Sequence, residues 1–470
     1  MQKMFYKTKR AKLRKAALLI TAALTVFTMN LTSSAVEASR LSKYDFELYM
    51  KPVWEAGTVY QETAVFYVNG DGKTENVTLL FRPETVVSVR SYGLDTVYSE
   101  GKDYVVTETG LALAEGSGIP VMPRSAYCDE NDREFSLQLK DGSGGALKTD
   151  NSVMPAYYLA VTYTTADTWS GPVPESEPDR LTGVSRKLAN KEPLTVSIIG
   201  DSISVGYSAS GLNEKTYRVD GTQTTAKIGI SPFMPTWPNQ LIEALKRTYG
   251  YDDITLTNWA IGGTSTSYGP IDDMIDRVIG SDPDLIIIGF GMNEYWSPAA
   301  GHRERIGNML ERFHDALPDA EFILLSGMLP NMMAYDESNV HLDEFEESYH
   351  SLQNGSAGLE IAVAPLNSVY RYVREKTGDF ALIGGNRNHP NDFAARLYAQ
   401  TVAAVLGVYD VPWRISGETD AGYDSETGAI PGAETPGKNL SVPLVGALAA
   451  TAVGATAVVS AVIVHKSKKK

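Results

Sequence analysis

The class of fold is indicated by one short segment, Val196-Ser197-Ile198-Ile199-Gly200-Asp201-Ser202. Its first four residues form a short and almost wholly apolar run, which is typical of a strand buried on both faces of a sheet. Similar runs follow at 254–257, 285–288 and 322–325, and helix-length segments lie at 239–249, 303–317 and 392–406. Alternating strands and helices predict an α/β domain with a doubly wound parallel sheet, whose functional site lies at the carboxyl ends of the strands.

The region before this domain has a different pattern. Short runs rich in β-branched and aromatic residues lie at 76–81, 85–89 and 157–163, and glycine-containing turn signals separate them. No long amphipathic helix is evident, so residues 39–170 are predicted to form an all-β sandwich. A segment rich in proline and acidic residues follows, and we expect residues 171–193 to be a linker and residues 194–412 to be the α/β domain.

The two ends of the chain suggest export and anchoring. A basic segment, an apolar run at 16–27 and small residues at Ala35 and Ala38 predict a cleaved signal peptide over 1–38, with an uncleaved anchor as the alternative. Near the other end, a Gly-, Pro- and acid-rich stretch predicts a disordered stalk, and 24 uncharged residues predict a transmembrane helix before a basic cytoplasmic tail. These three segments are 413–440, 441–464 and 465–470. We therefore expect an exported protein held at the cell surface in the plasma membrane.

The charge of the chain is unevenly distributed. The formal net charge is −15, but seven Lys/Arg lie in the first 15 residues and four Lys in the last five. Without residues 1–38 and those four lysines, 31 basic and 56 acidic residues remain, a net charge of about −25. Such an acidic body argues against a nucleic-acid partner, which needs a basic face. The single cysteine, Cys128, excludes an intrachain disulfide and a metal site built on several thiolates.

Chemically useful residues lie where the predicted strands end. Ser202 follows the first strand, Gly263 the second and Asn293 the third, while His389 comes just before the last helix. Each has a structural alternative: Ser202 as a helix cap, Gly263 in a tight turn and Asn293 as a loop cap. The other histidines are expected on solvated faces or in the tail: His302, His314, His341, His350 and His465.

The order of these four blocks resembles the SGNH (GDSL-type) hydrolases over about residues 194–412. The resemblance implies that Ser202 is the nucleophile and His389 the base that takes its proton. It also implies an oxyanion hole formed by the backbone N–H groups of Ser202 and Gly263 and the side-chain amide of Asn293. No cofactor and no metal are implied.

Two positions depart from the pattern of that family. Asn386 stands three residues before His389, where an aspartate usually orients the imidazole ring. Either the carbonyl oxygen of Asn386 supports a Ser–His dyad, or another acid serves, with Asp392 as the nearest candidate or else as the N-cap of the last helix. Glu294 stands where aspartate is usual after the oxyanion-hole asparagine.

The order of domains, together with the segments 328–331 and 233–237, resembles bacterial carbohydrate esterases with an N-terminal jelly-roll domain. That resemblance implies O-deacetylation of a polysaccharide such as xylan or a cell-surface glycan. Trp237, Tyr295 and Trp296 are candidates for stacking on a sugar face, with core or loop packing as the alternative. The acidic body favours a neutral, acetylated polysaccharide.

Two other functions stay open at this point. The first is a lipid or thioester hydrolase on the same scaffold, which should need a long apolar acyl groove. The second is a glycan-binding adhesin with an inactive hydrolase fold, for which Asn386 is the best support. A metal-dependent deacetylase is disfavoured because no His/Asp pair shows a ligand spacing such as His-x-x-x-His.

Overall fold

The computed structural model describes residues 45–410, except 131–136, 143, 149–152, 213, 220–221, 228 and 357, and it describes no side chains over 213–228. The predicted signal peptide, stalk, transmembrane helix and basic tail therefore lie outside the described residues. Among the helices that are described, none is both long enough and apolar enough to cross a membrane.

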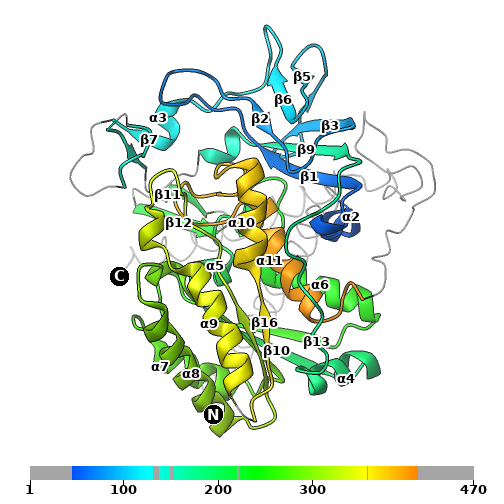
Figure 1. Cartoon of the computed structure of the whole chain (residues 1–470), viewed down its shortest axis with the longest axis vertical. Coiled ribbons are helices and arrows are strands. Elements are labelled where there is room, and N and C mark those ends of the chain that lie inside the picture. Colours follow the sequence, from blue (N-terminus) through cyan, green and yellow to red (C-terminus); the bar gives the residue numbers. More distant parts are fainter. Residues whose placement is uncertain are drawn as a thin grey trace, which may run out of the picture. The chain divides into compact units, whose positions relative to one another are not determined.

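A five-stranded parallel sheet forms the centre of the α/β domain (Figure 1). The strand order is β13 (Ile254–Asn258), β10 (Leu194–Gly200), β14 (Leu285–Gly289), β15 (Glu321–Leu325) and β16 (Ile361–Ala364), with every neighbouring pair parallel. This confirms the predicted doubly wound sheet and adds β16, which the sequence reading did not include. Chain order reverses at β10, and ligand sites of such sheets lie at the carboxyl ends of the strands beside that reversal.

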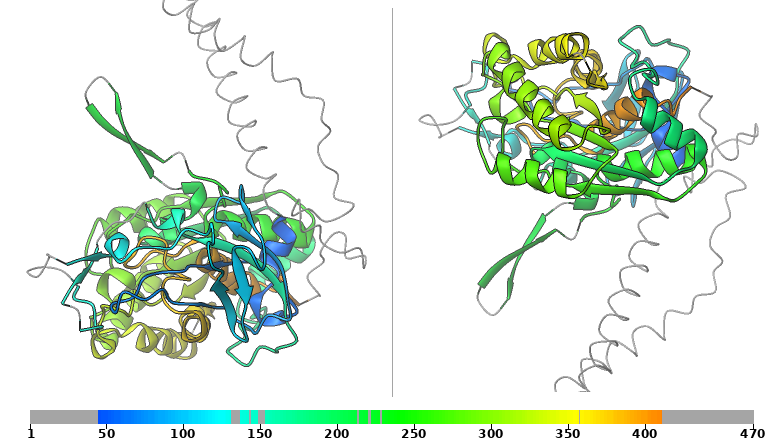
Figure 2. Two further views of the ribbon diagram at one scale, coloured as in Figure 1. Left: turned by 90° about the horizontal axis from the view of Figure 1, so that it is seen from above. Right: turned by 90° about the horizontal axis from the view of Figure 1, so that it is seen from below.

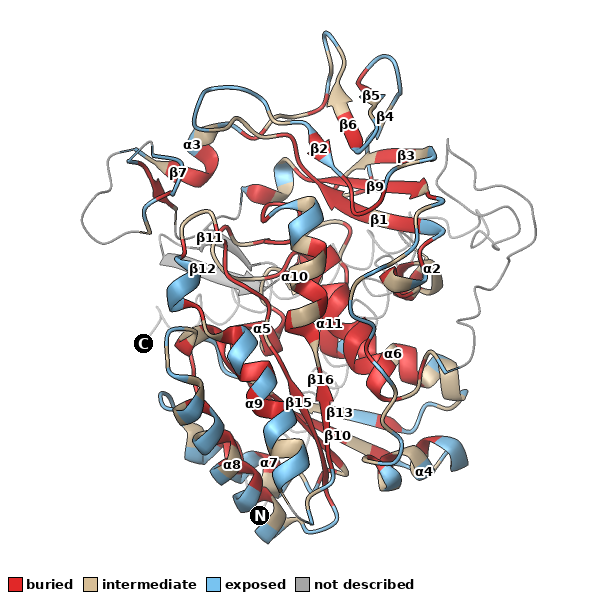
Figure 3. Ribbon diagram, in the orientation of Figure 1, coloured by how far each residue is buried: buried red, intermediate tan, exposed pale blue. Residues whose placement is uncertain are grey.

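Helices cover both faces of this sheet. The helices α7 (Ile271–Gly280), α8 (Ala299–Ala316) and α9 (Leu342–Gly355) contribute buried apolar side chains to one core with β14, β15 and β16. On the opposite face, α6 (Trp237–Tyr249) packs against β13, and α11 (Asp392–Val405) packs against α6 and β16. The helix α10 (Leu366–Thr377) contacts α9 and α11. Figure 3 shows exposed residues on the outer side of α8, as expected of an amphipathic surface helix.

The N-terminal region is built from small antiparallel sheets, as predicted for a β domain. The larger sheet has the order β1 (Thr58–Ala64), β9 (Leu159–Thr164), β3 (Thr85–Ser91) and β4 (Val97–Tyr98). The smaller sheets are β2 (Val77–Thr78), β6 (Gly110–Leu113) and β5 (Tyr104–Val106), and the pair β7 (Cys128–Asp129) and β8 (Ala146–Leu147). The helices of this region, α2 (Phe46–Met50) and α3 (Arg124–Tyr127), are a single turn or little more.

Three further elements lie between the β region and α6 in the sequence: α4, α5 and a hairpin. The segment predicted as a linker contains α4 (Thr182–Asn190), whose Val184 and Leu188 are buried. The short helix α5 (Ser202–Val205) follows β10 directly. An antiparallel hairpin, β11 (Glu214–Val219) and β12 (Thr222–Lys227), lies between α5 and α6 in the sequence.

The helix α11 joins the two regions, and every one of its residues is buried (Figure 3). Its polar side chains bond to the main chain of the N-terminal region. The Arg396 guanidinium donates to the Tyr60 carbonyl oxygen at 2.6 Å, and the Gln400 amide donates to that of Lys51 at 2.7 Å. In both views of Figure 2 the orange α11 accordingly lies among the blue N-terminal elements. Since α11 begins just after His389, this packing also fixes the segment that carries His389.

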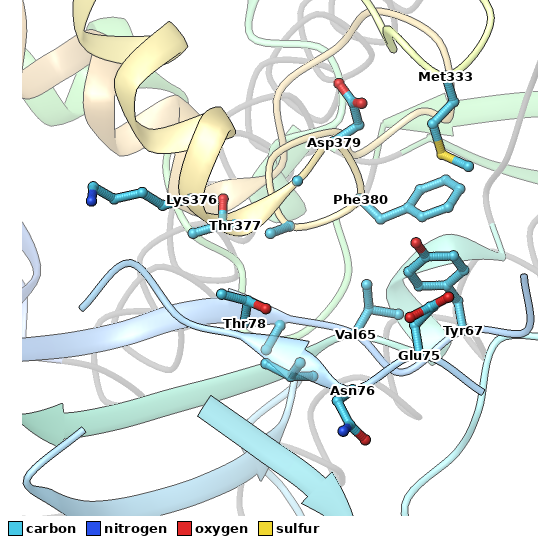
Figure 4. Close-up of a pocket in the computed structure, with 14 residues that line it drawn as sticks. Val65, Tyr67, Glu75, Asn76, Thr78, Met333, Lys376, Thr377, Asp379 and Phe380 are labelled. Atoms are coloured by element: carbon cyan, nitrogen blue, oxygen red, sulfur yellow. The ribbon is translucent and has the colours of Figure 1, made fainter. Parts of the chain in front are cut away.

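The junction between the β region and α10 leaves a cavity of about 310 Å³ (Figure 4). Thr78 and Tyr67 line it from the β region, and Lys376, Asp379 and Phe380 line it from the α/β domain. Its lining does not include Ser202 or His389.

Candidate active site

Ser202 lies at the sharp turn between β10 and α5. The Asp201 carboxylate caps α5 by accepting from the Ile203 N–H at 2.9 Å, which makes Ser202 the first helical residue. The turn needs glycine at position 200, because a β-carbon there would overlap the carbonyl oxygen of Gly289 on the neighbouring strand. Ser202 is 5% exposed and is thus held within the body of the protein beside the sheet edge.

His389 meets Ser202 from the far end of the chain. Its Nε2 lies 2.8 Å from Ser202 Oγ, a hydrogen-bond distance. The edge of its ring faces Tyr207, with ring centroids 5.6 Å apart. Its carbonyl oxygen accepts from the Gly384 N–H at 2.8 Å, so the loop around it is closed on itself. The structure thus joins the two residues predicted as nucleophile and base.

Gly263 and Asn293 lie together beside this pair. The Ile261 N–H donates to the Gly200 carbonyl oxygen at 3.0 Å, which ties the loop after β13 to the end of β10, two residues before Ser202. Asn293 Nδ2 donates to the Thr264 carbonyl oxygen at 2.8 Å, and Gly263 adopts a φ of 80°, which favours glycine. Within the described chain, the backbone N–H groups of Ser202 and Gly263 donate to no protein acceptor. Two backbone donors and the second amide proton of Asn293 therefore remain for a ligand.

A charged network under the loop fixes Asn293 and its neighbours. The buried Glu294 carboxylate accepts from the Thr266 N–H at 2.9 Å, from Thr266 Oγ1 at 2.8 Å and from the Arg305 guanidinium at 2.8 Å. His302 Nδ1 lies 3.1 Å from the same carboxylate. Burial alone raises the pKa of Glu294, but the hydrogen bond and charge of His302 and the donors of Thr266 lower it to about 2. Glu294, which replaces the usual aspartate, therefore holds the loop as an ion.

Two other buried carboxyl groups near Ser202 behave in the opposite way. Burial raises the pKa of Asp201 to about 7, although the Ile203 N–H opposes that rise. Burial likewise raises the pKa of Asp392 to about 6, against donors from Ser210 and Tyr92. No cation pairs with either carboxyl group among the described residues, so desolvation outweighs the hydrogen bonds.

Neither candidate for orienting His389 hydrogen-bonds its ring. The Asn386 amide donates to the carbonyl oxygens of Tyr127 at 3.2 Å and Lys148 at 2.7 Å, both in the β region, and its Oδ1 is buried with no partner. Asp392 Oδ1 accepts from the Ser210 N–H at 2.7 Å, while Oδ2 has no partner. Asp392 is also not the N-cap of α11, because that position belongs to Asn391.

The three aromatic candidates divide into two groups. Trp237 is fully buried, donates through Nε1 to the Ile203 carbonyl oxygen and stacks on Tyr398, so for this residue core packing replaces the alternative of a sugar contact. Tyr295 and Trp296 follow Glu294 directly, pack edge to face at 4.8 Å, and Trp296 is 58% exposed. They alone of the three present aromatic surface beside the site.

The prediction that His302 lies on a solvated face was also wrong. Its ring is fully buried on α8, stacked on Phe345 at 3.9 Å and within 2.9 Å of the Tyr349 hydroxyl. Sequence reasoning missed His302 and Arg305 as supports of the oxyanion loop. Their spacing of three residues on one helix face was the available signal, but Phe345 and Tyr349, which contact His302, come from the distant α9.

The described residues include no group of three or more His, Cys, Asp or Glu placed to hold a metal ion. What they present is a serine and histidine in hydrogen-bond contact, with unpaired N–H donors beside the serine, at the carboxyl end of a central parallel strand. This arrangement defines a hydrolase domain of the nucleophilic-serine kind.

Comparison with known proteins identifies that domain. Residues 198–397 match the model of the GDSL-like lipase/acylhydrolase family. The match lies within the α/β domain, and it supports the assignment of this domain to the GDSL/SGNH type of ester hydrolase. No curated protein matches the chain.

Solved structures with weak similarity include several esterases. One is an acetylxylan esterase from Geobacillus stearothermophilus, at 16% identity over 47% of this chain and 97% of that one, with a TM-score of 0.35. Another is a two-domain esterase active on acetylated mannans, at 17% identity over 50% of this chain and 55% of that one, with a TM-score of 0.37. A third is a member of the lipolytic G-D-S-L family from Veillonella parvula, at 16% identity over 45% of this chain and 97% of that one, with a TM-score of 0.33.

Proposed function

We propose that the protein removes O-acyl groups, chiefly O-acetyl groups, from a polysaccharide, with Ser202 as nucleophile and His389 as base. The observation that carries this proposal is the 2.8 Å contact between Ser202 Oγ and His389 Nε2, made beside unpaired N–H groups. A serine in contact with a base, next to N–H donors that can stabilise an oxyanion, is the arrangement that acyl transfer requires.

The reaction follows from these positions. Ser202 Oγ attacks the acyl carbonyl carbon while His389 Nε2 takes the hydroxyl proton. The carbonyl oxygen becomes an oxyanion, which the N–H groups of Ser202 and Gly263 and the Asn293 amide stabilise. His389 then gives its proton to the departing sugar oxygen, and the acyl group stays on Ser202. Water, activated by His389, attacks the acyl-enzyme, releases the acid and restores the serine.

Aromatic surface beside the site supports a carbohydrate as the acylated alcohol. Trp296, three residues after Asn293, is 58% exposed, and Tyr268 is 73% exposed in the turn that follows Gly263. Aromatic rings that remain this exposed offer flat apolar faces on which sugar rings can stack. The two residues lie on the two segments that carry the proposed oxyanion donors, so we expect a sugar bound on them to lie near Ser202.

The test is a comparison of substrates on the full chain. Wild type and Ser202→Ala are assayed with p-nitrophenyl acetate, p-nitrophenyl palmitate and acetylated xylan. We expect acetate release that depends on Ser202. Preference for palmitate would support a lipid hydrolase instead, and sugar binding without turnover of any substrate would support the adhesin.

We propose the outer cell surface as the site of action, on the sequence pattern at 1–38 and 441–464 alone. Protease added to intact cells should then digest the hydrolase domain, and the full chain should sediment with membranes. Deleting 441–464 should release active enzyme into the medium. A chain that resists external protease and stays in the soluble fraction would contradict this location.

A further inference from the structure

Arg387, a half-buried arginine, lies beside the proposed active site and pairs with none of the described residues. Arg387 precedes His389 by two residues, and its carbonyl oxygen accepts from the Asn331 N–H at 2.6 Å. Its guanidinium makes no hydrogen bond and no ion pair with any described residue, and its Nε is buried with no acceptor. Other partly buried arginines of this domain are paired: Arg305 with Glu294 at 2.8 Å and Arg374 with Asp379 at 2.7 Å.

The positive charge of Arg387 lies near two tyrosines beside the proposed site, Tyr295 and Tyr335. It lies close enough to Tyr295 and Tyr335 for its positive charge to oppose the rise that burial causes in the pKa of both phenols. The two phenol rings pack edge to face at 5.1 Å. Tyr295 follows Asn293 by two residues, so the guanidinium is bounded by the segment of the proposed oxyanion donor and by that of the proposed base.

An arginine in this position has a definite chemical preference. Its planar guanidinium presents several N–H donors in a fixed geometry that matches a carboxylate or a phosphate, often through two parallel hydrogen bonds. A buried donor left without an acceptor is unfavourable, and an anionic ligand would satisfy it. A neutral sugar hydroxyl would satisfy the hydrogen bond but not the charge.

We propose that Arg387 binds a negatively charged group, a carboxylate or a phosphate, on the sugar unit next to the acylated hydroxyl. The substrate is then an acylated anionic polysaccharide rather than a neutral one. This inference rests on the proposed ester hydrolysis at Ser202 and adds the charge of the substrate to it.

The net charge of the chain gives the opposite expectation. An acidic body repels an anionic polymer at long range, whereas Arg387 attracts it at contact. Salt screens the long-range repulsion between exposed charges more strongly than a half-buried contact. Moderate salt should therefore lower the KM for an anionic substrate while Arg387 continues to select it.

The experiment compares full-length wild type, Arg387→Ala and Arg387→Lys. Arg186→Ala is the matched control, because it also removes one positive charge but lies away from the proposed site. The neighbouring Lys187 pairs with Asp284, which precedes β14 and so lies at the end of the sheet opposite to Ser202. The substrates are acetylated xylan oligosaccharides without charge, acetylated galacturonate oligosaccharides, and an acetylated polymer with phosphodiester links. The last two distinguish a carboxylate from a phosphate.

In Arg387→Ala we expect the ratio of kcat/KM on the preferred anionic substrate to that on neutral xylan to fall about 10- to 100-fold, mainly through KM. Arg387→Lys should restore part of the ratio, and Arg186→Ala should leave it unchanged. A wild type that prefers neutral xylan, or an Arg387→Ala ratio equal to wild type, would overturn the inference. Loss of Ser202 dependence with all substrates would instead refute the proposed function itself.

Discussion

The two sides of the active site are held in place by different forces. On the oxyanion side, Glu294 is an ion whose pKa is lowered to about 2 and which binds Thr266, His302 and Arg305. On the nucleophile side, Asp201 and Asp392 accept hydrogen bonds but face no cation among the described residues, and burial raises their pKa to about 7 and 6. A buried carboxyl group is thus ionised and paired on the oxyanion side, whereas on the nucleophile side it is desolvated and has a raised pKa.

Burial by itself therefore does not determine the charge of a carboxyl group. All three carboxyl groups have 4% or less of their surface exposed. What separates them is whether positively charged donors come with them into the interior. On the oxyanion side α8 supplies such a donor, Arg305, from the same helix as His302, whose Nδ1 lies 3.1 Å from the carboxylate.

The largest expected loss of activity comes from removing the hydroxyl group of Ser202. Replacing Ser202 with Ala removes the proposed nucleophile, and kcat/KM for p-nitrophenyl acetate should fall by at least about 10,000-fold. Ser204→Ala is the matched control, since Ser204 lies on the same short helix and its hydroxyl donates to the Gly289 carbonyl oxygen at 3.1 Å. If both variants lose activity equally, the loss reflects the turn rather than the nucleophile.

Removing one donor of the proposed oxyanion hole should lower the activity less than removing Ser202. Asn293→Ala removes one of three proposed donors, so kcat should fall about 100- to 1,000-fold with little change in KM. Steady-state kinetics on p-nitrophenyl acetate measures both. A rise in KM at constant kcat would show that Asn293 binds the ground state instead of the oxyanion.

The charges of the two sides should give opposite pH dependences of stability. Glu294, with its lowered pKa, contributes stability that is complete above about pH 4.5 and is lost as the pH falls toward 2. Glu294→Gln should therefore cost about 3 kcal/mol of unfolding free energy at pH 7 and much less near pH 2. Chemical denaturation of both proteins across that range measures the difference.

Asp201, with its raised pKa, should make the protein less stable as the pH rises. The unfolded chain ionises near pH 3.8 while the folded group keeps its proton until about pH 7, so wild type loses stability over that interval as the pH rises. Asp201→Asn should keep the cap to Ile203 and lack this loss. A constant difference in stability between wild type and Asp201→Asn from pH 4 to pH 8 would refute the contrast between the two sides.

A smaller effect is expected where the His389 loop meets the β region. Asn386→Asp places the residue usual in the family at that position, but a carboxylate cannot donate to the carbonyl oxygens of Tyr127 and Lys148. The free energy of unfolding should fall by about 2 kcal/mol, and activity should fall rather than rise. Thermal unfolding and acetate release measure the two quantities. Higher activity in Asn386→Asp would show that the carboxylate reaches the imidazole.

The sequence predicted the framework well because that framework depends on local patterns. Four strands of the parallel sheet were predicted from apolar runs, whereas β16, with its small residues Ala362 and Ala364, was not. The ordered blocks also brought out Ser202 and His389, which the structure joins.

The environment of single side chains could not be predicted in the same way. Trp237 and His302 are buried by elements that come much later in the sequence. Asn386 bonds to residues 238 and 259 positions away. The sequence did not predict a role for Arg387, because only the three-dimensional arrangement shows that no described residue pairs with it.

The most direct test of the account is covalent trapping of the nucleophile. Full-length wild type is incubated with a fluorophosphonate, and the labelled peptide is identified by mass spectrometry. We predict a single phosphonyl group on Ser202, slower labelling in His389→Ala, and none in Ser202→Ala. A label on another residue, or acetate release that persists in Ser202→Ala, would contradict the assignment of Ser202 and His389 as the reacting pair.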